Sequence, residues 1–157
     1  MLNPDFYPTP KAVIKKMLSP YMDNIEHRKI LEPSAGKGDI VDYILANHPF
    51  YRHKEIFIKC CEYDPDLIAT LQGKKYQVVS SDFLKYVPSH YYDLIIMNPP
   101  FSNGVDHLLH AWEILQSGDI VCLLNAETIH NPHTEKRKLL KRIIDDNKGT
   151  VEFLGNV

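Results

Sequence analysis

The stretch Asp93–Phe101, with the sequence DLIIMNPPF, decides the fold of this 157-residue chain. Its four consecutive apolar residues, Leu94–Met97, show no polar alternation, which is typical of a strand buried on both faces of a parallel sheet. Two prolines then end the strand, because proline donates no hydrogen bond to a neighbouring strand and fixes its own φ. We therefore expect a rigid, non-helical turn at the carboxyl end of a central strand, the edge at which open α/β sheets bind ligands.

The turn after this strand offers hydrogen-bond acceptors and a flat apolar surface. Pro99 and Pro100 leave carbonyl groups without adjacent N–H groups, and Asn98 adds an amide oxygen. Phe101 adds an aromatic face. Two acceptors beside an aromatic ring suit a planar group that carries an NH2, although a strand followed by a proline turn and a core phenylalanine would give the same residues.

Composition indicates one globular domain without a membrane span. Apolar residues make up 44% of the chain and charged residues 24%, and no long apolar run or signal-like N-terminal segment is present. The net charge of −2 does not favour a free-standing nucleic-acid binder, although it allows an enzyme core whose DNA contacts lie in a separate module. Cys60, Cys61 and Cys122 follow no zinc-ligand spacing, so we expect reduced thiols, no metal site and a cytoplasmic protein.

Strand-like and helical patterns alternate along the chain. Besides 94–97, one strand-like run ends at Leu31 and others occupy 56–61, 76–80, 120–125 and 150–154. A helix from Pro10 to about Tyr21, with Thr9 as its N-cap, precedes them. The alternation predicts an α/β fold with a Rossmann-like doubly wound, mostly parallel sheet of six strands.

A glycine-rich turn, EPSAGKGD at Glu32–Asp39, separates the first strand from its helix. A P-loop is excluded because Gly36-Lys37 is followed by Gly38 and not by serine or threonine. A dinucleotide fingerprint is disfavoured because Val41 stands where that pattern has its third glycine. The loop therefore favours a ligand other than a pyrophosphate.

Acidic residues follow the second and third strands. Glu62 lies where a carboxylate can accept hydrogen bonds from both hydroxyls of a nucleoside ribose, and Asp64-Pro65 is expected to start the next helix. Asp82 lies in Ser81–Leu84, which a simple turn also explains. On the helix after the proline turn, His107 and His110 have no partners for a metal site, so we expect solvated or partly buried histidines.

The basic run EKRKLLKR at Glu135–Arg142 begins an amphipathic helix. Its apolar side chains, which include Leu139 and Leu140, can pack on the sheet while its basic side chains face solvent. Contact between those basic side chains and nucleic-acid phosphates is the alternative interpretation.

Three of these motifs together match one known family. Asn98-Pro99-Pro100-Phe101 resembles the (D/N)PP(Y/F) motif of S-adenosylmethionine-dependent methyltransferases that act on amino groups, above all the adenine-N6 DNA methyltransferases. Glu32-Pro33-Ser34 with Gly36 and Gly38 resembles that family's (E/D)PxxGxG loop, and Thr9-Pro10 its N-terminal motif. The motifs follow the family's order over residues 6–129. The chain thus resembles a class I methyltransferase, such as those of prophages and restriction-modification systems.

The resemblance implies which residues bind S-adenosyl-L-methionine. Around its methionine part they are Tyr7, Thr9, Glu32, Pro33, Ser34, Gly36 and Gly38, with Thr9 on the carboxylate, Glu32 on the ammonium and the glycines close to the backbone of the ligand. Around its nucleoside they are Glu62 on the ribose, Tyr63 beside the adenine, Asp82 on the adenine amine and Phe83 on the ring. Asn98 belongs to both the cofactor set and the catalytic set.

The resemblance also implies a reaction. Asn98 and the Pro99 carbonyl would accept the hydrogens of the target amine, in a turn held by Pro100, and Phe101 would stack on an adenine flipped out of DNA. RNA adenine and protein glutamine are alternative targets for the same chemistry. A cofactor-binding module without activity is a further alternative.

Two departures from the family pattern affect the domain organisation. The family sheet has seven strands, the last antiparallel, whereas six are predicted here, so the last strand is expected to be missing. A target-recognition region is also missing after the NPPF half. We therefore expect residues 1–157 to form a single catalytic domain, either minimal or a fragment, with an additional recognition domain or subunit as a possible partner in binding DNA.

Overall fold

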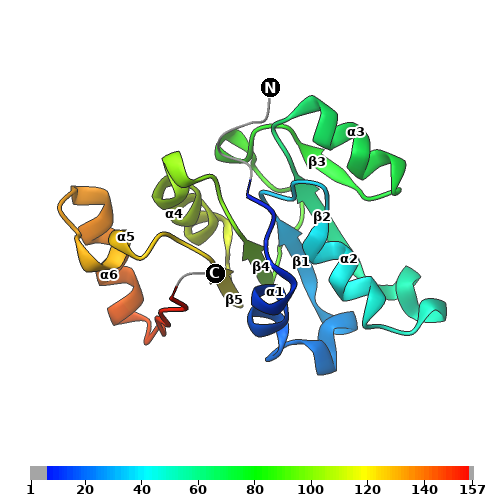
Figure 1. Cartoon of the computed structure of the whole chain (residues 1–157), viewed down its shortest axis with the longest axis horizontal. Helices are drawn as coiled ribbons and strands as arrows, with labels where there is room; N and C mark the ends of the chain where they lie inside the picture. The colour runs from blue at the N-terminus through cyan, green and yellow to red at the C-terminus, as the bar shows by residue number, and fades with distance from the viewer. Residues whose placement is uncertain (1–6, 156–157) are drawn as a thin grey trace.

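A five-stranded parallel sheet with the order β3-β2-β1-β4-β5 forms the centre of the molecule (Figure 1). The computed structural model describes residues 7–155, apart from the side chains of residues 50–52. The strands are β1 (Lys29–Glu32), β2 (Phe57–Cys61), β3 (Val78–Ser80), β4 (Leu94–Met97) and β5 (Asp119–Cys122). The α-helices are α1 (Lys11–Leu18), α2 (Asp39–Ala46), α3 (Pro65–Gly73), α4 (Gly104–Ile114), α5 (Glu127–His130) and α6 (Glu135–Asp146). Short 3-10 helices are η1 (Met22–His27), η2 (Phe50–Glu55), η3 (Phe83–Lys85) and η4 (Phe101–Asn103).

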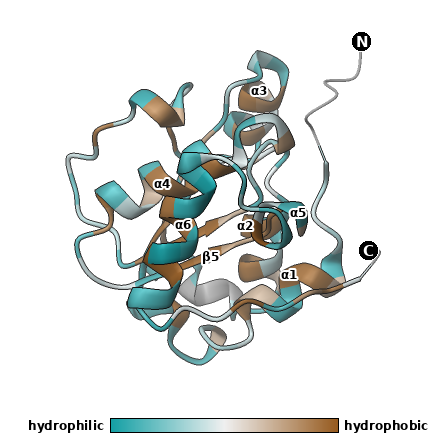
Figure 2. Ribbon diagram, turned by 90° about the vertical axis from the view of Figure 1, so that its left-hand side faces the viewer, coloured by the Kyte–Doolittle hydropathy of each residue, from teal (hydrophilic) through white to brown (hydrophobic). Residues whose placement is uncertain are grey.

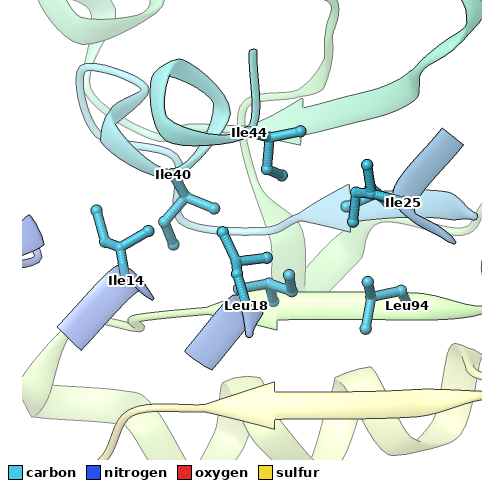
Figure 3. Packing of buried hydrophobic residues seen from close by; sticks show 8 residues of the cluster. Ile14, Leu18, Ile25, Ile40, Ile44 and Leu94 are labelled. Atoms are coloured by element: carbon cyan, nitrogen blue, oxygen red, sulfur yellow. The ribbon is translucent and has the colours of Figure 1, made fainter. Parts of the chain in front are cut away.

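Strand β4 is buried on both faces, as its apolar run predicts. All four of its residues are inaccessible to solvent, and it pairs in parallel with both β1 and β5. Leu94 and Ile96 pack with Ile14, Leu18 and Ile25 of α1 and η1 and with the isoleucines of α2 on one face (Figure 3). Ile95 and Met97 point to the other face and pack with Leu31 and with Ala111 of α4. Helices therefore cover both faces, which confirms the doubly wound arrangement.

The amino ends of three neighbouring strands meet at Asp93. Its side chain accepts a hydrogen bond from the Lys29 amide at 3.0 Å, its own amide donates to the Lys29 carbonyl, and its carbonyl accepts from the Asp119 amide. Gly118 fits against this junction with φ +137°, and a Cβ atom there would lie 2.0 Å from the Asp93 carbonyl oxygen. Only glycine is compatible with this close approach.

The predicted strand over 150–154 is wrong. In the part of the chain that the structure describes, residues after α6 form no strand and do not pair with β5. Val151 and Phe153 are about half exposed, Glu152 forms an ion pair with Lys16 of α1, and the Phe153 ring stacks on His130 at 4.3 Å. Side-chain contacts with two helices, rather than backbone pairing, hold this alternating segment.

The start of the first helix also differs from expectation. Helix α1 begins at Lys11 with Pro10 as its N-cap residue, and no side chain caps it. Thr9 is therefore not the cap, because its hydroxyl accepts a hydrogen bond from Asn98 instead. The helix ends at Leu18 rather than near Tyr21, because Pro20 has no N–H with which to continue the helical hydrogen bonds. The predicted cap at Asp64 is confirmed, with its carboxylate accepting from the Asp66 and Leu67 amides.

Helix α6 is amphipathic and lies at the edge of the molecule. Figure 2 shows it as mostly hydrophilic, in contrast to the hydrophobic strands. Leu140 is its buried residue, Leu139 is 45% exposed, and the helix packs against α4 and α5 rather than on the sheet. The predicted helix is confirmed, but its apolar face meets other helices.

Candidate functional site

A cavity of about 430 Å³ opens where the parallel strands end. Twelve of the residues expected at a site line it: Tyr7, Thr9, Glu32, Pro33, Ser34, Gly36, Glu62, Tyr63, Asp82, Phe83, Asn98 and Pro100. Gly38, Pro99 and Phe101 do not. The cavity therefore brings together residues from the chain start and from the ends of β1 to β4, at the edge of the sheet where ligands bind.

The glycine loop after β1 turns tightly and presents its backbone to this cavity. Gly36 has φ +58°, and its amide donates to Oε2 of Glu62 at 2.7 Å. Gly38 has φ +93° and is the N-cap residue of α2, where a Cβ atom would lie 3.0 Å from side-chain atoms of Leu71 and Tyr76. Gly36 thus lies at the cavity, whereas Gly38 allows α2 to start against α3.

Glu62 fixes the loop and lines the cavity. One carboxylate oxygen accepts from the Gly36 amide, and the other accepts from the Asp64 amide at 2.9 Å. Each carboxylate oxygen can accept more than one hydrogen bond, so both remain able to bind a ligand hydroxyl. The carboxylate is therefore oriented before any ligand binds.

Glu32 is a buried acid with an unsatisfied oxygen. The side chain is 2% exposed, and no residue between 7 and 155 donates a hydrogen bond to its Oε2 atom. Burial raises the pKa of this carboxyl well above its ordinary value, and the negative charges of Asp39, Glu62 and Asp42 raise it further. A cationic group in the cavity would provide the missing partner and favour the ionised form.

Asn98 is held by the segment before α1. Its amide nitrogen donates to the Tyr7 carbonyl at 3.1 Å and to the Thr9 hydroxyl at 3.0 Å, and the Tyr7 ring meets the Phe101 ring edge-on at 5.1 Å. Because a carbonyl oxygen can only accept, these bonds fix which side of the amide is nitrogen. The Asn98 oxygen consequently stays available as an acceptor. Figure 1 shows this N-terminal segment passing the arrowhead end of the sheet.

The third strand leads into the other end of the cavity. Asp82 caps η3, where its Oδ1 atom accepts from the Leu84 amide at 3.1 Å. Phe83 is 4% exposed, with its ring packed against His110 at 4.9 Å and His107 at 5.6 Å. Tyr63 is 79% exposed at the rim. This end combines aromatic and aliphatic surface with one carboxylate.

His107 lines the cavity, although no role there was expected for it. It is 8% exposed and shares the buried face of α4 with Gly104 and Ala111. The spacing 104, 107 and 111 is the signal that could have placed it, because residues three and seven apart lie on one side of a helix.

The comparison with protein families identifies the chain. The model of the methyltransferase small domain family matches residues 16–148. The chain belongs to this family.

Solved structures of methyltransferases share the fold. A type I restriction-modification methyltransferase subunit from Streptococcus thermophilus gives a TM-score of 0.70 at 16% identity over 90% of this chain and 39% of its own. An RNA methyltransferase from Salinibacter ruber in complex with S-adenosyl-L-homocysteine gives 0.60 at 21% identity, over 76% and 79%. A Pyrococcus horikoshii protein proposed to be an RNA methyltransferase gives 0.65 at 21% identity, over 93% and 75%. No curated protein matches the chain.

A second cavity of this methyltransferase, of about 330 Å³, lies on the other side of the NPPF turn. Pro99 and Phe101 line it together with Lys136 and Arg137 from the start of α6. Pro100 and Asn103 line both cavities. Asn98 and its turn therefore separate a larger cavity with acidic groups from a smaller one with an exposed aromatic ring, two basic side chains and two acidic ones, Asp106 and Glu127.

Among residues 7–155, no three His, Cys, Asp or Glu side chains are grouped as a metal site would require. Cys60, Cys61 and Cys122 are free thiols, and burial raises the pKa of Cys61 to about 12. The helices within the described range lack the length and apolar character needed to cross a membrane.

Proposed function

We propose that this methyltransferase transfers a methyl group from S-adenosyl-L-methionine to the exocyclic amine of adenine in DNA. The observation that carries the proposal is the orientation of Asn98. Its nitrogen is bonded to Tyr7 and Thr9, and its oxygen is left as an acceptor in the turn between the two cavities. An oxygen held in this way can accept a hydrogen bond from an NH2 group.

The larger cavity fits S-adenosyl-L-methionine in one direction. Glu32, with its unsatisfied oxygen, suits the ammonium group, and the Thr9 hydroxyl retains a proton to donate to the carboxylate. Glu62 suits the ribose hydroxyls, and the end near Asp82 and Phe83 suits a flat purine with an amino group. This direction satisfies the buried oxygen and places the apolar ring on apolar surface.

The residues around the NPPF turn would then act on the target amine. The bound cofactor supplies an electrophilic methyl group. Asn98 Oδ1 and the Pro99 carbonyl would accept the two hydrogens of the amine, which directs its nitrogen lone pair towards the larger cavity. Alignment of this kind accelerates the reaction by removing the entropic cost of orienting the two reactants.

The smaller cavity is proposed to take the target base. Phe101, which is 53% exposed, would stack on an adenine flipped out of the duplex. Lys136 forms an ion pair with Asp106, and Arg137 donates to the Asn131 carbonyl, so both cations are already engaged. We therefore propose that an additional recognition domain or subunit provides most of the affinity for the nucleic acid. We expect the reaction to take place in the cytoplasm.

RNA adenine is the second candidate target. Its support is the fold shared with the Salinibacter RNA methyltransferase over 79% of that chain, whereas the chain spans 39% of the type I subunit. Both candidates use the same acceptors for an NH2 group.

Transfer of labelled methyl from S-adenosyl-L-methionine to unmethylated DNA, RNA and protein tests the proposal. Label on adenine N6 of DNA, lost in the Asn98→Ala variant, is expected. Label on RNA or on protein glutamine would replace the DNA assignment. Cofactor binding without label on any substrate would instead indicate a binding module, and a folded sample that binds no cofactor would contradict the proposal as a whole.

A further inference from the structure

The two histidines of α4 contact the same phenylalanine but have different surroundings. His107 and His110 both pack against the Phe83 ring. His107 lines the larger cavity, whereas His110 does not and instead contacts the Tyr86 carbonyl and Glu113. The pair therefore offers a site residue and a matched control on one helix.

The hydrogen bond of His107 determines which of its nitrogens is an acceptor. Nδ1 lies 3.0 Å from the Asn103 carbonyl oxygen, so Nδ1 carries the proton in this contact. Burial lowers the pKa of His107, and His110 lowers it further, against the opposing effects of the Asn103 hydrogen bond and the charges of Asp106 and Asp82. In the neutral ring, which this lowered pKa favours, the contact with Asn103 leaves the lone pair on Nε2. No residue between 7 and 155 forms a hydrogen bond with Nε2.

Two acceptors thus serve the same end of the cavity. Asp82 and His107 both line it, the Asp82 charge acts on His107, and the Phe83 ring lies against the imidazole. Both groups accept hydrogen bonds beside an apolar surface. A purine amino group has two hydrogens to donate, whereas a purine carbonyl has none.

We propose that His107 Nε2 accepts one hydrogen of the cofactor's adenine amino group while Asp82 accepts the other, so that His107 selects adenine over hypoxanthine in the bound nucleoside. This inference rests on the proposed binding of S-adenosyl-L-methionine in the larger cavity. It adds a specificity-determining residue that does not touch the reacting atoms.

A purely structural role for His107 makes a different prediction. If His107 only packs on Phe83 and forms a hydrogen bond with Asn103, its substitution would change the stability and the affinity for every ligand together. Substitution of a residue that binds the amino group would instead change the ratio of the affinities for two ligands that differ only in that group. That ratio separates the two roles.

Calorimetric titration with S-adenosylhomocysteine and S-inosylhomocysteine, which carries a carbonyl in place of the amino group, measures the ratio. The wild-type protein is expected to prefer the adenine ligand. His107→Phe should lower that preference roughly 2- to 12-fold, the factor that one neutral hydrogen bond contributes. His110→Phe should leave it unchanged, and His107→Gln, which retains an acceptor oxygen, should restore part of it. His107→Leu, which also lacks an acceptor, replaces His107→Phe in the comparison where the latter does not fold.

The outcomes distinguish the inference from the proposed function. Equal preference in wild-type and His107→Phe proteins, or a wild-type protein without preference, would overturn the role of His107 while leaving the cofactor assignment intact. Failure of the folded wild-type protein to bind S-adenosylhomocysteine would overturn both.

Discussion

The two ends of the parallel sheet use polar groups in opposite ways. At the amino end, Asp93 has its side chain, amide and carbonyl all bonded to neighbouring strands. At the carboxyl end, buried oxygens of Glu32, Ser34 and Asn103 have no partner among the described residues, and all three line the larger cavity. An unsatisfied buried oxygen destabilises a protein unless a ligand completes its hydrogen bonds, so these three oxygens favour ligand binding at this end of the sheet.

This difference between the two ends of the sheet predicts that substitutions at its amino end alter stability alone. Gly118→Ala places a methyl group 2.0 Å from the Asp93 carbonyl oxygen and imposes a strained φ, so we expect a loss of about 3 kcal/mol in the free energy of unfolding. Denaturant titration measures it. Gly73→Ala, where no atom lies within 4 Å of the new Cβ, is the matched control and should have little effect. Equal stability of the two variants would contradict the role assigned to Gly118.

Changes at the carboxyl end should reduce ligand affinity. Glu62→Ala removes a carboxylate that holds the Gly36 amide and that we propose binds the ribose, so S-adenosylhomocysteine should bind about 2–3 kcal/mol more weakly. Asp64→Ala is the control, because Asp64 caps α3 but does not line the cavity. That variant should lose stability and retain affinity. Unchanged binding by Glu62→Ala would identify Glu62 as a loop residue only.

Phe101→Ala should weaken the binding of nucleic acid and leave the binding of the cofactor unchanged. The loss of base stacking is expected to weaken binding of single-stranded oligonucleotides containing adenine by about 2 kcal/mol. Tyr7 contacts the same ring, so the affinity for S-adenosylhomocysteine is the control for damage to the N-terminal segment. Equal oligonucleotide binding by both proteins would remove Phe101 from the target site.

Glu32→Gln should change stability and affinity in opposite directions. The folded-state pKa of Glu32 is raised, so its contribution to stability is greatest below its ordinary value of 4.5 and decreases as the pH rises towards the folded-state pKa. The neutral variant should therefore be more stable than wild type at pH 7, with this difference absent at pH 4. It should also bind S-adenosylhomocysteine about 1.5 kcal/mol more weakly, because the ammonium loses a charged partner. Thermal unfolding at both pH values and calorimetry test the two effects; a less stable variant at pH 7 would contradict the burial argument.

The sequence predicts features that depend on local chemistry. The apolar run of β4, the proline turn and the Asp64 cap each follow from adjacent residues, and all three occur in the structure. The alternation of such runs was enough to predict the doubly wound sheet. The residues lining the cavity followed from a family resemblance that fixes which strand ends meet.

Features that depend on distant contacts were not predictable. Thr9 is the expected cap by local rules, but its hydroxyl is bonded to Asn98, 89 residues away. Residues 150–154 alternate like a strand, but contacts with α1 and His130 hold them instead. To predict His107 at the cavity, one must know which face of α4 meets the cavity, and the local sequence does not show this. In each case a tertiary contact decided among conformations that the local sequence allows equally.

In the proposed reaction the Asn98 oxygen accepts a hydrogen bond from the target amine, while the Asn98 nitrogen is held by the N-terminal segment. The most direct test is the rate of methyl transfer by Asn98→Ala, measured beside its affinity for S-adenosylhomocysteine. We expect kcat to fall about 100-fold or more while the cofactor affinity stays nearly unchanged, because the hydrogen bond lost between the target amine and residue 98 acts in the transition state. Thr9→Val, which removes one partner of the Asn98 nitrogen and keeps the oxygen, should lose far less activity. An Asn98→Ala protein that methylates at the wild-type rate would show that the Asn98 oxygen has no role in the reaction.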